Sequence, residues 1–336
     1  ESTGKCKFLY MLDLPHEDNE CEKVKYAQAI MRLKKAYEKF SGKTFDKEAF
    51  LNSFTENETE MKPYIGLLGV RVTGILEKMI RDNIQMDVDN LTCTGGRQLA
   101  VVPEQMRQMD EEKMFLAYAD ALLCQIPCFR MNNNTRRNQL YLDPNLKGII
   151  YHTIKFCDYY GFEYASIKKN IKVPLLKIET DFTSQSAGQL LTRIQAFAET
   201  IEGSEDMDPG KGISEEARKK MESGIYYVAG IDSGSTSTDV VILDQDGKIK
   251  STMIIPTGGG AMMSAEKSLD LAVEKAGIKK EEIVRIVTTG YGRAYIESGD
   301  DSITEITCHA KGAHYLNPNV RTVIDIGGKD IKAISI

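Results

Sequence analysis

Two apolar runs in the second half of the sequence are separated by only five residues. YYVAGID (226–232) and TDVVILD (238–244) flank SGSTS, and a DQDG turn then leads into KIKSTMIIP. Connections this short join antiparallel neighbours, whereas parallel neighbours need a crossover of about a dozen residues or more. The spacing therefore predicts an antiparallel meander and excludes a Rossmann crossover at this point.

The elements after this meander narrow the fold further. A helical pattern over 261–277 is followed by the strand IVRIVTTG (283–290), a helical stretch around 304–315 and the strand TVIDIGG (322–328). The succession β-β-β-α-β-α-β is typical of ribonuclease-H-like ATPases of the actin and Hsp70 type. We therefore predict such an ATPase subdomain over residues 225–336.

The first half alternates helices with short buried strands. The apolar runs GIIYHTI (148–154) and VPLLKIET (173–180) predict strands. Apolar residues at helical spacing predict helices over 22–40, in FDKEAFLNSF, near 64–82 and over 186–201. This alternation is the signature of a parallel α/β sheet, so we expect a Rossmann- or flavodoxin-like region.

Residues 202–224, EGSEDMDPGKGISEEARKKMESG, form the clearest break in composition. Gly, Pro, Ser and dense charge indicate a linker, with one short helix starting at Ser214. A chain of 336 residues is also long enough for two domains with separate cores. We therefore divide it into residues 1–201, the linker, and residues 225–336.

Composition excludes several kinds of partner. The net charge of −6 argues against a nucleic-acid surface, which needs clustered Lys and Arg, and no apolar run approaches the roughly 20 residues that span a bilayer. The seven cysteines are odd in number and widely spaced, which favours reduced thiols in a cytoplasmic protein. A CxxC pair is absent, so a zinc ribbon has no support, but a metal site assembled from distant cysteines stays open.

The turn inside the meander has the chemistry of a phosphate site. Glycine lets the backbone approach a phosphate, successive N–H groups form an anion-binding nest, and hydroxyls add donors. Asp232, at the end of the first strand, can hold Mg²⁺ through water. GxxxxGK[ST] is absent, which excludes a Walker P-loop, and the alternative is a Gly-Ser hairpin without function. The predicted phosphate ligands are Gly234, Ser235, Thr236 and Ser237.

A second copy of this pattern lies near the end of the sequence. TVIDIGGKD (322–330) repeats the apolar strand, Asp and Gly-rich turn, and TTGYGR (288–293) is a third Gly-rich turn after a strand. Two such hairpins facing each other can clamp the β- and γ-phosphates of ATP, with Asp232 and Asp325 as catalytic residues flanking the metal. The further predicted ligands are Gly327, Gly328 and Asp330.

The motifs GIDSGSTSTDVVILD, TTGYGR, EITCHAKGA and DIGGKD together resemble the activator ATPases of 2-hydroxyacyl-CoA dehydratases (BadF/BadG type), in the actin, Hsp70 and sugar-kinase superfamily. The resemblance covers about residues 225–336. It implies a homodimer that holds a [4Fe-4S] cluster at its interface and uses ATP to deliver a low-potential electron. Many members have Lys where this chain has Asp239, and Gln where it has Lys329. By motif position Cys308 is a buried helix thiol and not a cluster ligand.

Cys157 directly follows a buried strand and precedes a helix. Ligands gather at the carboxyl ends of parallel strands, and a helix N-terminus favours a thiolate. From position alone, Cys157 is therefore either an iron ligand or an inert buried thiol.

Several segments of the first half resemble the catalytic D-component of the same dehydratase system. They include LYMLDLPHED, NLTCTGGRQ, IPCFRM and LKGIIYHTIKFCDYYGFEY, and the resemblance covers about residues 1–201. It implies a [4Fe-4S] cluster, or a double-cubane cluster, with Cys157 as a ligand and with Cys128 and Cys93 as weaker candidates. Cys124, one helical turn before Cys128, can be core, and Cys6 and Cys21 have no motif support.

Other polar residues leave two interpretations open. His16 and His152 suggest general bases, but surface or core histidines are expected more often. Glu179 and Asp181 end a strand, where they either orient a ligand or cap the next helix.

These features lead to one main functional hypothesis and two alternatives. The main one is an ATP-dependent activase joined to an iron–sulfur module of a 2-hydroxyacyl-CoA dehydratase or related reductase, in the cytoplasm. Its partners would be dehydratase or reductase subunits and an electron donor such as ferredoxin or flavodoxin. The alternatives are a sugar or small-metabolite kinase of the same fold, and a nucleotide-sensing scaffold.

The resemblance also implies that further parts belong to this system. The activator's cluster cysteines and adenosine-binding segment are expected beyond Ile336, and further D-component ligands before Glu1. We therefore expect this chain alone to bind nucleotide weakly and to transfer no electrons.

Overall fold

The computed structural model describes residues 7–54, 62–93, 95, 99, 103–125, 131, 135–181, 187–205, 213–222, 224–327 and 331–336. The chain divides into two compact units, Glu1–Gln185 and Ser186–Ile336. None of the helices in the described ranges has both the length and the apolar character that crossing a membrane requires.

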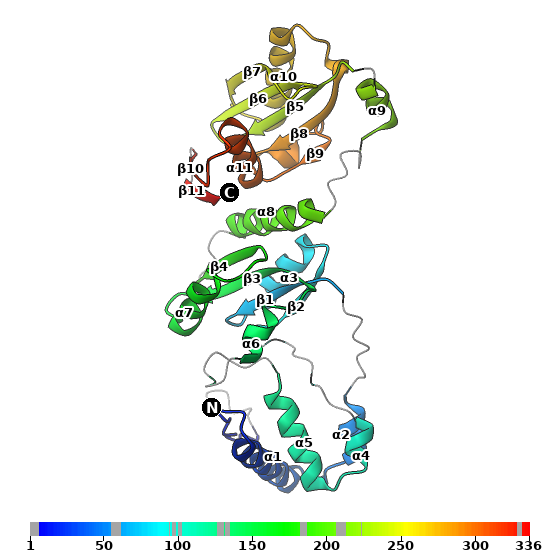
Figure 1. The fold of residues 1–336 in the computed structure, drawn as a ribbon, viewed down its shortest axis with the longest axis vertical. Helices are drawn as coiled ribbons and strands as arrows, with labels where there is room; N and C mark the ends of the chain where they lie inside the picture. Colours follow the sequence, from blue (N-terminus) through cyan, green and yellow to red (C-terminus); the bar gives the residue numbers. More distant parts are fainter. Residues whose placement is uncertain are drawn as a thin grey trace. The chain divides into compact units, whose positions relative to one another are not determined.

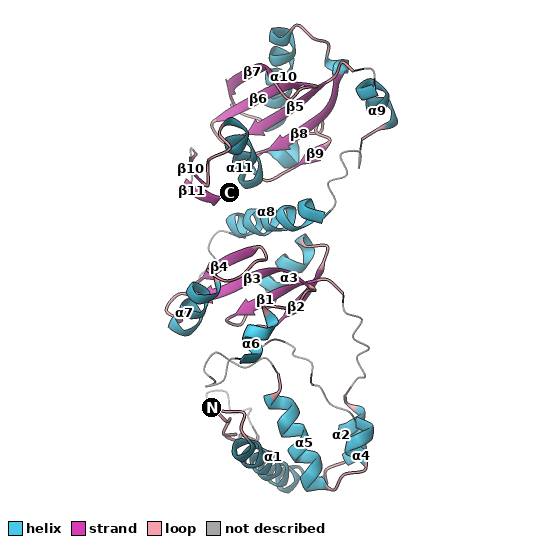
Figure 2. Cartoon of the chain, viewed as in Figure 1, coloured by secondary structure: helices cyan, strands magenta, loops and turns pink. Residues whose placement is uncertain are grey.

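The first unit contains a four-stranded parallel sheet in the order β2-β1-β3-β4 (Figures 1 and 2). β3 is buried along almost its whole length, as expected for a parallel strand covered on both faces. This confirms the predicted parallel α/β arrangement. The elements are β1 (Tyr64–Gly69), α3 (Gly74–Asn83), β2 (Asp87–Asn90), α6 (Thr135–Leu140), β3 (Leu146–Ile154), α7 (Asp158–Ile167) and β4 (Leu175–Thr180).

The helix expected near 64–82 is wrong in its first part, because β1 occupies residues 64–69 and only α3 is helical. The run YIGLLG is buried from Ile65 to Gly69, and short apolar runs do not distinguish a buried strand from a helix. A close approach to β3 requires Gly69, which has φ +92°; a Cβ there would lie 2.1 Å from the carbonyl oxygen of His152.

A helical cluster is a second part of the first unit among the residues that the structure describes. Leu51, Met114 and Phe115 are its buried centre, and Phe45 and Phe50 pack against them. The helices expected over 22–40 and in FDKEAFLNSF are confirmed. The helices of this cluster are α1 (Glu20–Ser41), α2 (Lys47–Asn52), α4 (Pro103–Arg107) and α5 (Glu111–Leu123).

The second unit contains the predicted meander. β5, β6 and β7 are antiparallel neighbours, and β8 lies parallel to β5 on its other side, so the sheet order is β7-β6-β5-β8-β9. The strands are β5 (Tyr227–Ser233), β6 (Ser237–Asp244), β7 (Ile249–Pro256), β8 (Ile283–Thr289) and β9 (Asp301–Ser302). Short 3₁₀ turns, Lys280–Glu282 and Arg293–Tyr295, precede and follow β8.

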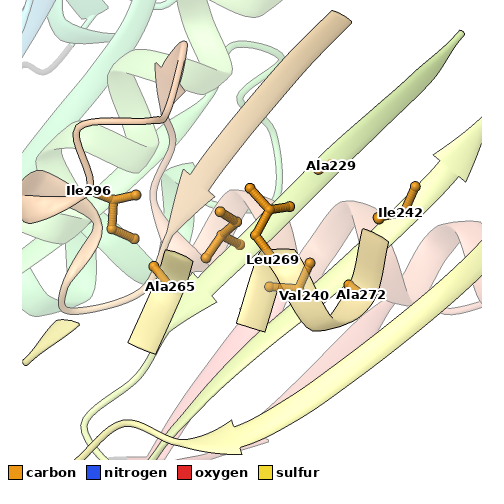
Figure 3. Packing of buried hydrophobic residues seen from close by; sticks show 8 residues of the cluster. Ala229, Val240, Ile242, Ala265, Leu269, Ala272 and Ile296 are labelled. Carbon is orange, nitrogen blue, oxygen red and sulfur yellow. The ribbon is translucent and has the colours of Figure 1, made fainter. Parts of the chain in front are cut away.

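Helix α10 (Ala261–Ala276) covers one face of this sheet. Side chains alternate along a strand, so Ala229 and Ile231 of β5 face α10, and Asp232 faces the opposite side. The labelled residues of this core are Ala229, Val240, Ile242, Ala265, Leu269, Ala272 and Ile296 (Figure 3).

The last predicted strand does not extend the five-stranded sheet. β10 (Thr322–Ile326) pairs with β11 (Ile331–Ser335) in a separate antiparallel hairpin, and β9 takes the edge beside β8. Strand order in a sheet depends on long-range pairing, which local patterns do not encode.

Three helices complete the second unit: α8 (Ala187–Glu205), α9 (Glu215–Glu222) and α11 (Glu305–Leu316). Ser214 caps α9 through a hydrogen bond from the Ala217 amide, at the predicted helix start. α8 belongs to the second compact unit, although the division by sequence grouped it with residues 1–201. That division remains a prediction about functional modules.

Replacing Leu269 tests the α10 core. Leu269 is fully buried, so Leu269→Ala should cost about 2–5 kcal/mol of unfolding free energy in the second unit, measured by urea denaturation. Met263 on the same helix is 74% exposed, and Met263→Ala should change stability by less than about 0.5 kcal/mol. Equal losses in the two variants would contradict this packing.

Candidate functional site

The turn between β5 and β6 is a tight hairpin with an exposed tip. The Gly234 amide donates to the Ser237 carbonyl oxygen at 2.9 Å, and the Thr257 hydroxyl donates to the Gly234 carbonyl oxygen at 2.8 Å. Ser235 and Thr236 at the tip are exposed. The structure therefore places the predicted Gly-Ser-Thr-Ser turn at the carboxyl end of β5, where a phosphate can reach it.

The second predicted hairpin is also present. Asp325 lies on β10 and pairs in register with Lys332 of β11, and Gly327 follows directly after β10. The predicted ligands Gly328 and Asp330 lie outside the described residues, as does Lys329.

His309 of α11 lies between the two predicted aspartates. Its Nε2 is 3.1 Å from Oδ2 of Asp232, and its Nδ1 is 3.1 Å from Oδ2 of Asp325. Both ring nitrogens donate together only in the imidazolium form. The hydrogen bond with Asp232, and then the charge of Asp325, raise the pKa of His309 above its usual value. The two hairpins thus meet on one side chain of α11.

Sequence reasoning missed His309, although it lies inside the quoted segment EITCHAKGA. The helical pattern placed it on a helix, but nothing in its spacing linked it to either hairpin. Its neighbour Cys308 is half-buried on the same helix, and burial raises the pKa of that thiol, in keeping with the predicted helix thiol.

A chain of ion pairs extends from this centre. Lys332 lies 2.7 Å from Glu305 and 3.8 Å from Asp325, and Arg293 of the TTGYGR turn lies 3.9 Å from Glu305. Glu305 is in the first turn of α11, where its negative charge interacts favourably with the positive end of the helix dipole. The ion pairs therefore join α11 to β11 and to the third Gly-rich turn.

Oxygen atoms suited to a hard cation line the same region. Asp239, Asp232 and Thr289 are aligned across β6, β5 and β8. Among the described residues, Asp239 Oδ1, Thr289 Oγ1 and the nearby Ser233 Oγ are buried without a hydrogen-bond partner. Buried polar atoms without partners are rare in proteins. An oxygen-lined site of this kind fits Mg²⁺ held through water and phosphate oxygens.

Asp239 of β6 lies directly across from Asp232 of β5. Burial raises the pKa of its carboxyl, and the neighbouring Asp232 raises it further. Asp239 therefore places a second, half-buried carboxyl beside Asp232, and two neighbouring carboxylates favour a cation at this edge of the sheet.

The TTGYGR turn packs tightly against the first hairpin. Gly290 has φ +84°, and a Cβ there would lie 2.2 Å from Oδ1 of Asp232. The Gly292 amide donates to the Ser233 carbonyl oxygen at 2.8 Å. The third Gly-rich turn is thus part of the same site.

Cys157 lies where the sequence predicted, after β3 and at the N-cap of α7. It is half-buried and lines a cavity of about 570 Å³, together with Lys155, Lys177 and Glu179. Phe156 beside it is 98% exposed and has φ +71°, an uncommon conformation outside glycine.

A buried ion pair holds α7, the helix that starts at Cys157. Arg137 and Glu163 are 2% and 4% exposed and form a bidentate pair at 2.5 and 2.6 Å. Tyr151 and Tyr141 also donate to the Glu163 carboxylate. Removing one partner of such a pair leaves an uncompensated buried charge, so this network anchors α7 to β3 and α6.

Of the other predicted iron ligands, only Cys93 lies among the described residues, and it packs against the same core cluster as Cys157. Cys128 and Cys6 lie outside the described residues, and Cys93 is half-buried. Cys124 is exposed at the C-cap of α5, so its interpretation as a core residue is wrong. Within the described ranges no three His, Cys, Asp or Glu side chains are placed to hold a metal ion. The described residues therefore do not form the ligand set of an iron–sulfur cluster.

The remaining candidates have structural surroundings. His16 is exposed, whereas His152 is buried, with Nδ1 3.0 Å from the Val70 carbonyl oxygen and Nε2 2.8 Å from the Thr180 hydroxyl. Both ring nitrogens of His152 are thus used within the fold, as expected for a core histidine. Glu179 pairs with Lys177 and Asp181 with Lys155, each at 2.9 Å.

Comparison with known proteins relates the two parts of the chain to one biochemical system. Residues 57–201 match the family described as 2-hydroxyglutaryl-CoA dehydratase, D-component. Residues 229–336 match the BadF/BadG/BcrA/BcrD ATPase family. Together with the parallel sheet, the ATPase match confirms the mixed α/β fold class.

Individual relatives match about a third of the chain. The chain is 46% identical over 110 residues to the activator of lactoyl-CoA dehydratase of Anaerotignum propionicum, covering 33% of this chain and 42% of that protein. It is 40% identical over 111 residues to the (R)-2-hydroxyglutaryl-CoA dehydratase activating ATPase of Acidaminococcus fermentans, again 33% and 42%. The crystal structure of component A of that dehydratase is 39% identical, covers 33% of this chain and 43% of that chain, and has a TM-score of 0.32. The chain thus spans about 42% of the length of these curated relatives.

Replacing Gly290 tests the contact between the third turn and Asp232. Gly290→Ala should destabilise the second unit by about 1–2 kcal/mol for the left-handed backbone and by about 1–3 kcal/mol more for the clash with Asp232. Gly258 also has positive φ but faces open space, so Gly258→Ala should show the backbone cost alone. Similar urea midpoints for the two variants would argue against the clash.

The buried His152 should make the folding stability of the first unit sensitive to acid. Burial lowers its pKa in the folded chain, so below the unfolded value of about 6.5 the unfolded chain binds a proton that the folded chain does not. Stability should therefore fall as pH drops below about 6.5, by up to about 1.4 kcal/mol per pH unit. Denaturation series at several pH values should show a weaker dependence in His152→Gln and an unchanged one in His16→Gln.

Proposed function

We propose that this chain binds Mg²⁺·ATP between its two Gly-rich hairpins as the ATPase part of a 2-hydroxyacyl-CoA dehydratase-type activation system. The observation that carries the proposal is the meeting of Asp232 and Asp325 on His309. The match of residues 229–336 to an ATPase family supports it. Because the chain spans less than half the length of its curated relatives, their activities are extended to it here by proposal.

Each hairpin has a role in this proposal. The amides and hydroxyls of Gly234–Ser237 would bind phosphate oxygens on one side, and Gly327, Gly328 and Asp330 would bind them on the other. Asp232 would hold Mg²⁺ through water, and Asp325 would flank it. The metal would neutralise charge on the phosphates, so the protein's own contribution is positioning and electrostatic stabilisation.

His309 has to share Asp232 with the metal. A carboxylate that accepts from an imidazolium is less available to a hydrated cation, because both compete for the same oxygens. The buried oxygens of Asp239, Ser233 and Thr289 provide further polar surface at this edge. We propose that His309 keeps the two aspartates close together and that Mg²⁺·nucleotide then occupies the region between them.

The first part of the chain extends the proposal to electron transfer. The match of residues 57–201 to a dehydratase D-component favours an electron acceptor over a kinase substrate domain. In this proposal Cys157 supplies one thiolate to a [4Fe-4S] or double-cubane cluster, with Cys128 as a second candidate and the rest outside the described residues. The cluster would supply the low-potential electron chemistry, and the ATPase would drive its reduction.

The proposed partners follow from the same system. They are dehydratase or reductase subunits and an electron donor such as ferredoxin or flavodoxin, in the cytoplasm. A homodimer of the ATPase part is also proposed. The reaction served would be removal of water from a 2-hydroxyacyl-CoA, or reduction of a small molecule in the double-cubane case.

Calorimetric titration with ATP, in the presence and in the absence of Mg²⁺, tests the proposed nucleotide binding. Asp232→Asn should remove the Mg²⁺-dependent part of the binding and weaken affinity by about tenfold or more. Asp246 is an exposed aspartate in the turn between β6 and β7, so Asp246→Asn should bind as the original chain does. Absence of any nucleotide binding would overturn the proposal.

Iron content tests the electron-transfer part separately. In protein that also carries the further D-component segments, anaerobic purification should yield iron that Cys157→Ser lacks, and Cys21→Ser should retain it because Cys21 is exposed on α1. Nucleotide binding without iron in any variant would leave the ATPase proposal standing and remove the cluster from it.

A further inference from the structure

Helix α8 links the two family matches physically. The dehydratase-like match ends at residue 201, within α8, yet α8 belongs to the compact unit that holds the ATPase-like sheet. It contacts α11, the helix that carries His309 (Figure 1). The end of one matched segment is therefore packed on the other.

Glu199 of α8 takes over the N-terminal cap of α11. Its Oε1 accepts the Thr304 amide at 2.8 Å, and its Oε2 accepts the hydroxyls of Thr304 at 2.7 Å and Thr307 at 2.5 Å. Thr304 is the N-cap residue and is 1% exposed, and its hydroxyl points to Glu199 instead of capping its own helix. A carboxylate at a helix N-terminus accepts hydrogen bonds from free N–H groups and interacts favourably with the positive end of the helix dipole.

Gln195 makes the second contact, one helical turn before Glu199. Its Oε1 accepts a hydrogen bond of 2.9 Å from Nη2 of Arg293 in the TTGYGR turn. Positions four apart lie on the same helix face, so one face of α8 makes both contacts. Nη1 of the same arginine donates to the Gly290 carbonyl oxygen at 3.0 Å.

Both contacts reach elements that touch Asp232. Thr304 is the N-cap of α11, and His309, in the second turn of that helix, contacts Asp232 at 3.1 Å. Gly290, held by Arg293, packs directly against the Asp232 carboxylate. If nucleotide binding shifted α11 or the TTGYGR turn, the hydrogen bonds of Glu199 or Gln195 would therefore change.

We propose that α8 is the intramolecular connection through which the nucleotide site acts on the dehydratase-like segment, with Glu199 and Gln195 as its positioning residues. This inference rests on the proposed nucleotide binding. It adds the route by which nucleotide binding would change the structure outside the ATPase-like part. Coupling between two sites is reciprocal, so disturbing the α8 face changes nucleotide affinity. Neither residue lies within the segment that matches the ATPase family.

Hydrogen exchange in the original chain gives the first test. Addition of Mg²⁺·ADP should change the exchange rates of amides in residues 187–205, as well as those of the two hairpins. A purely structural contact would keep the same protection with and without nucleotide. Protection of the hairpins by Mg²⁺·ADP with no change in α8 would overturn the inference and leave the proposed function intact.

A double variant gives the second test. Glu199→Gln with Gln195→Ala should weaken Mg²⁺·ADP binding by about fivefold or more, and should abolish the nucleotide-dependent exchange in α8. Glu202 is exposed on the same helix, so Glu202→Gln is the matched control and should keep both properties. Equal affinities in the double variant and the control would contradict the inference.

The two tests separate the inference from the proposed function. If Mg²⁺·ADP protects nothing in the original chain, the nucleotide site itself fails and the inference fails with it. If the double variant does not fold, which exchange in β5 to β7 without nucleotide would reveal, the result with the original chain decides alone.

Discussion

Asp232 and Asp325 stand on two separate hairpins, and the His309 imidazole lies between them with a carboxylate at each ring nitrogen. The contacts of both carboxylates with this one ring tie β5, β10 and α11 together, and they favour the imidazolium form of His309. The ion pairs of Glu305 with Lys332 and Arg293 add the third Gly-rich turn and β11 to the same arrangement. This centre adds to the packing of both hairpin strands on α11, because the described residues of β10 and β11 pair with each other and not with the five-stranded sheet.

The alternation of side chains along β5 explains how a single strand serves both the core and the site. Ile231 faces α10 and is fully buried, whereas Asp232 faces α11 and its ion pairs. The left-handed conformation and missing side chain of Gly290 then allow the TTGYGR turn to close against the Asp232 carboxylate. The packing of β5 on α10 therefore positions the polar side of that strand, whose partners come from distant parts of the unit.

The first unit shows the same division between scaffold and candidate residue. The buried Arg137–Glu163 pair anchors α7, and Cys157 stands at the start of that helix beside a cavity. Such a pair is costly to break, which makes it a strong positional constraint even where its net stabilisation is small. The hydrogen bonds of Glu199 and Gln195 lie within the second unit, where they join the end of the segment matched to a dehydratase D-component to α11 and to the TTGYGR turn.

The sequence alone determined the meander, the two hairpins, the position of Asp232 near the end of its strand and that of Cys157 after its strand. Turn length and apolar periodicity act over a few residues, so a local pattern carries these features. It misplaced β1, since a short buried run suits a strand or a helix equally. Only the tertiary structure decided that His309 joins both aspartates, that TVIDIGG forms its own hairpin and that α8 caps α11. These contacts link residues as far apart as 77 positions for His309 and Asp232 and 105 for Glu199 and Thr304, and no local pattern carries information over such separations.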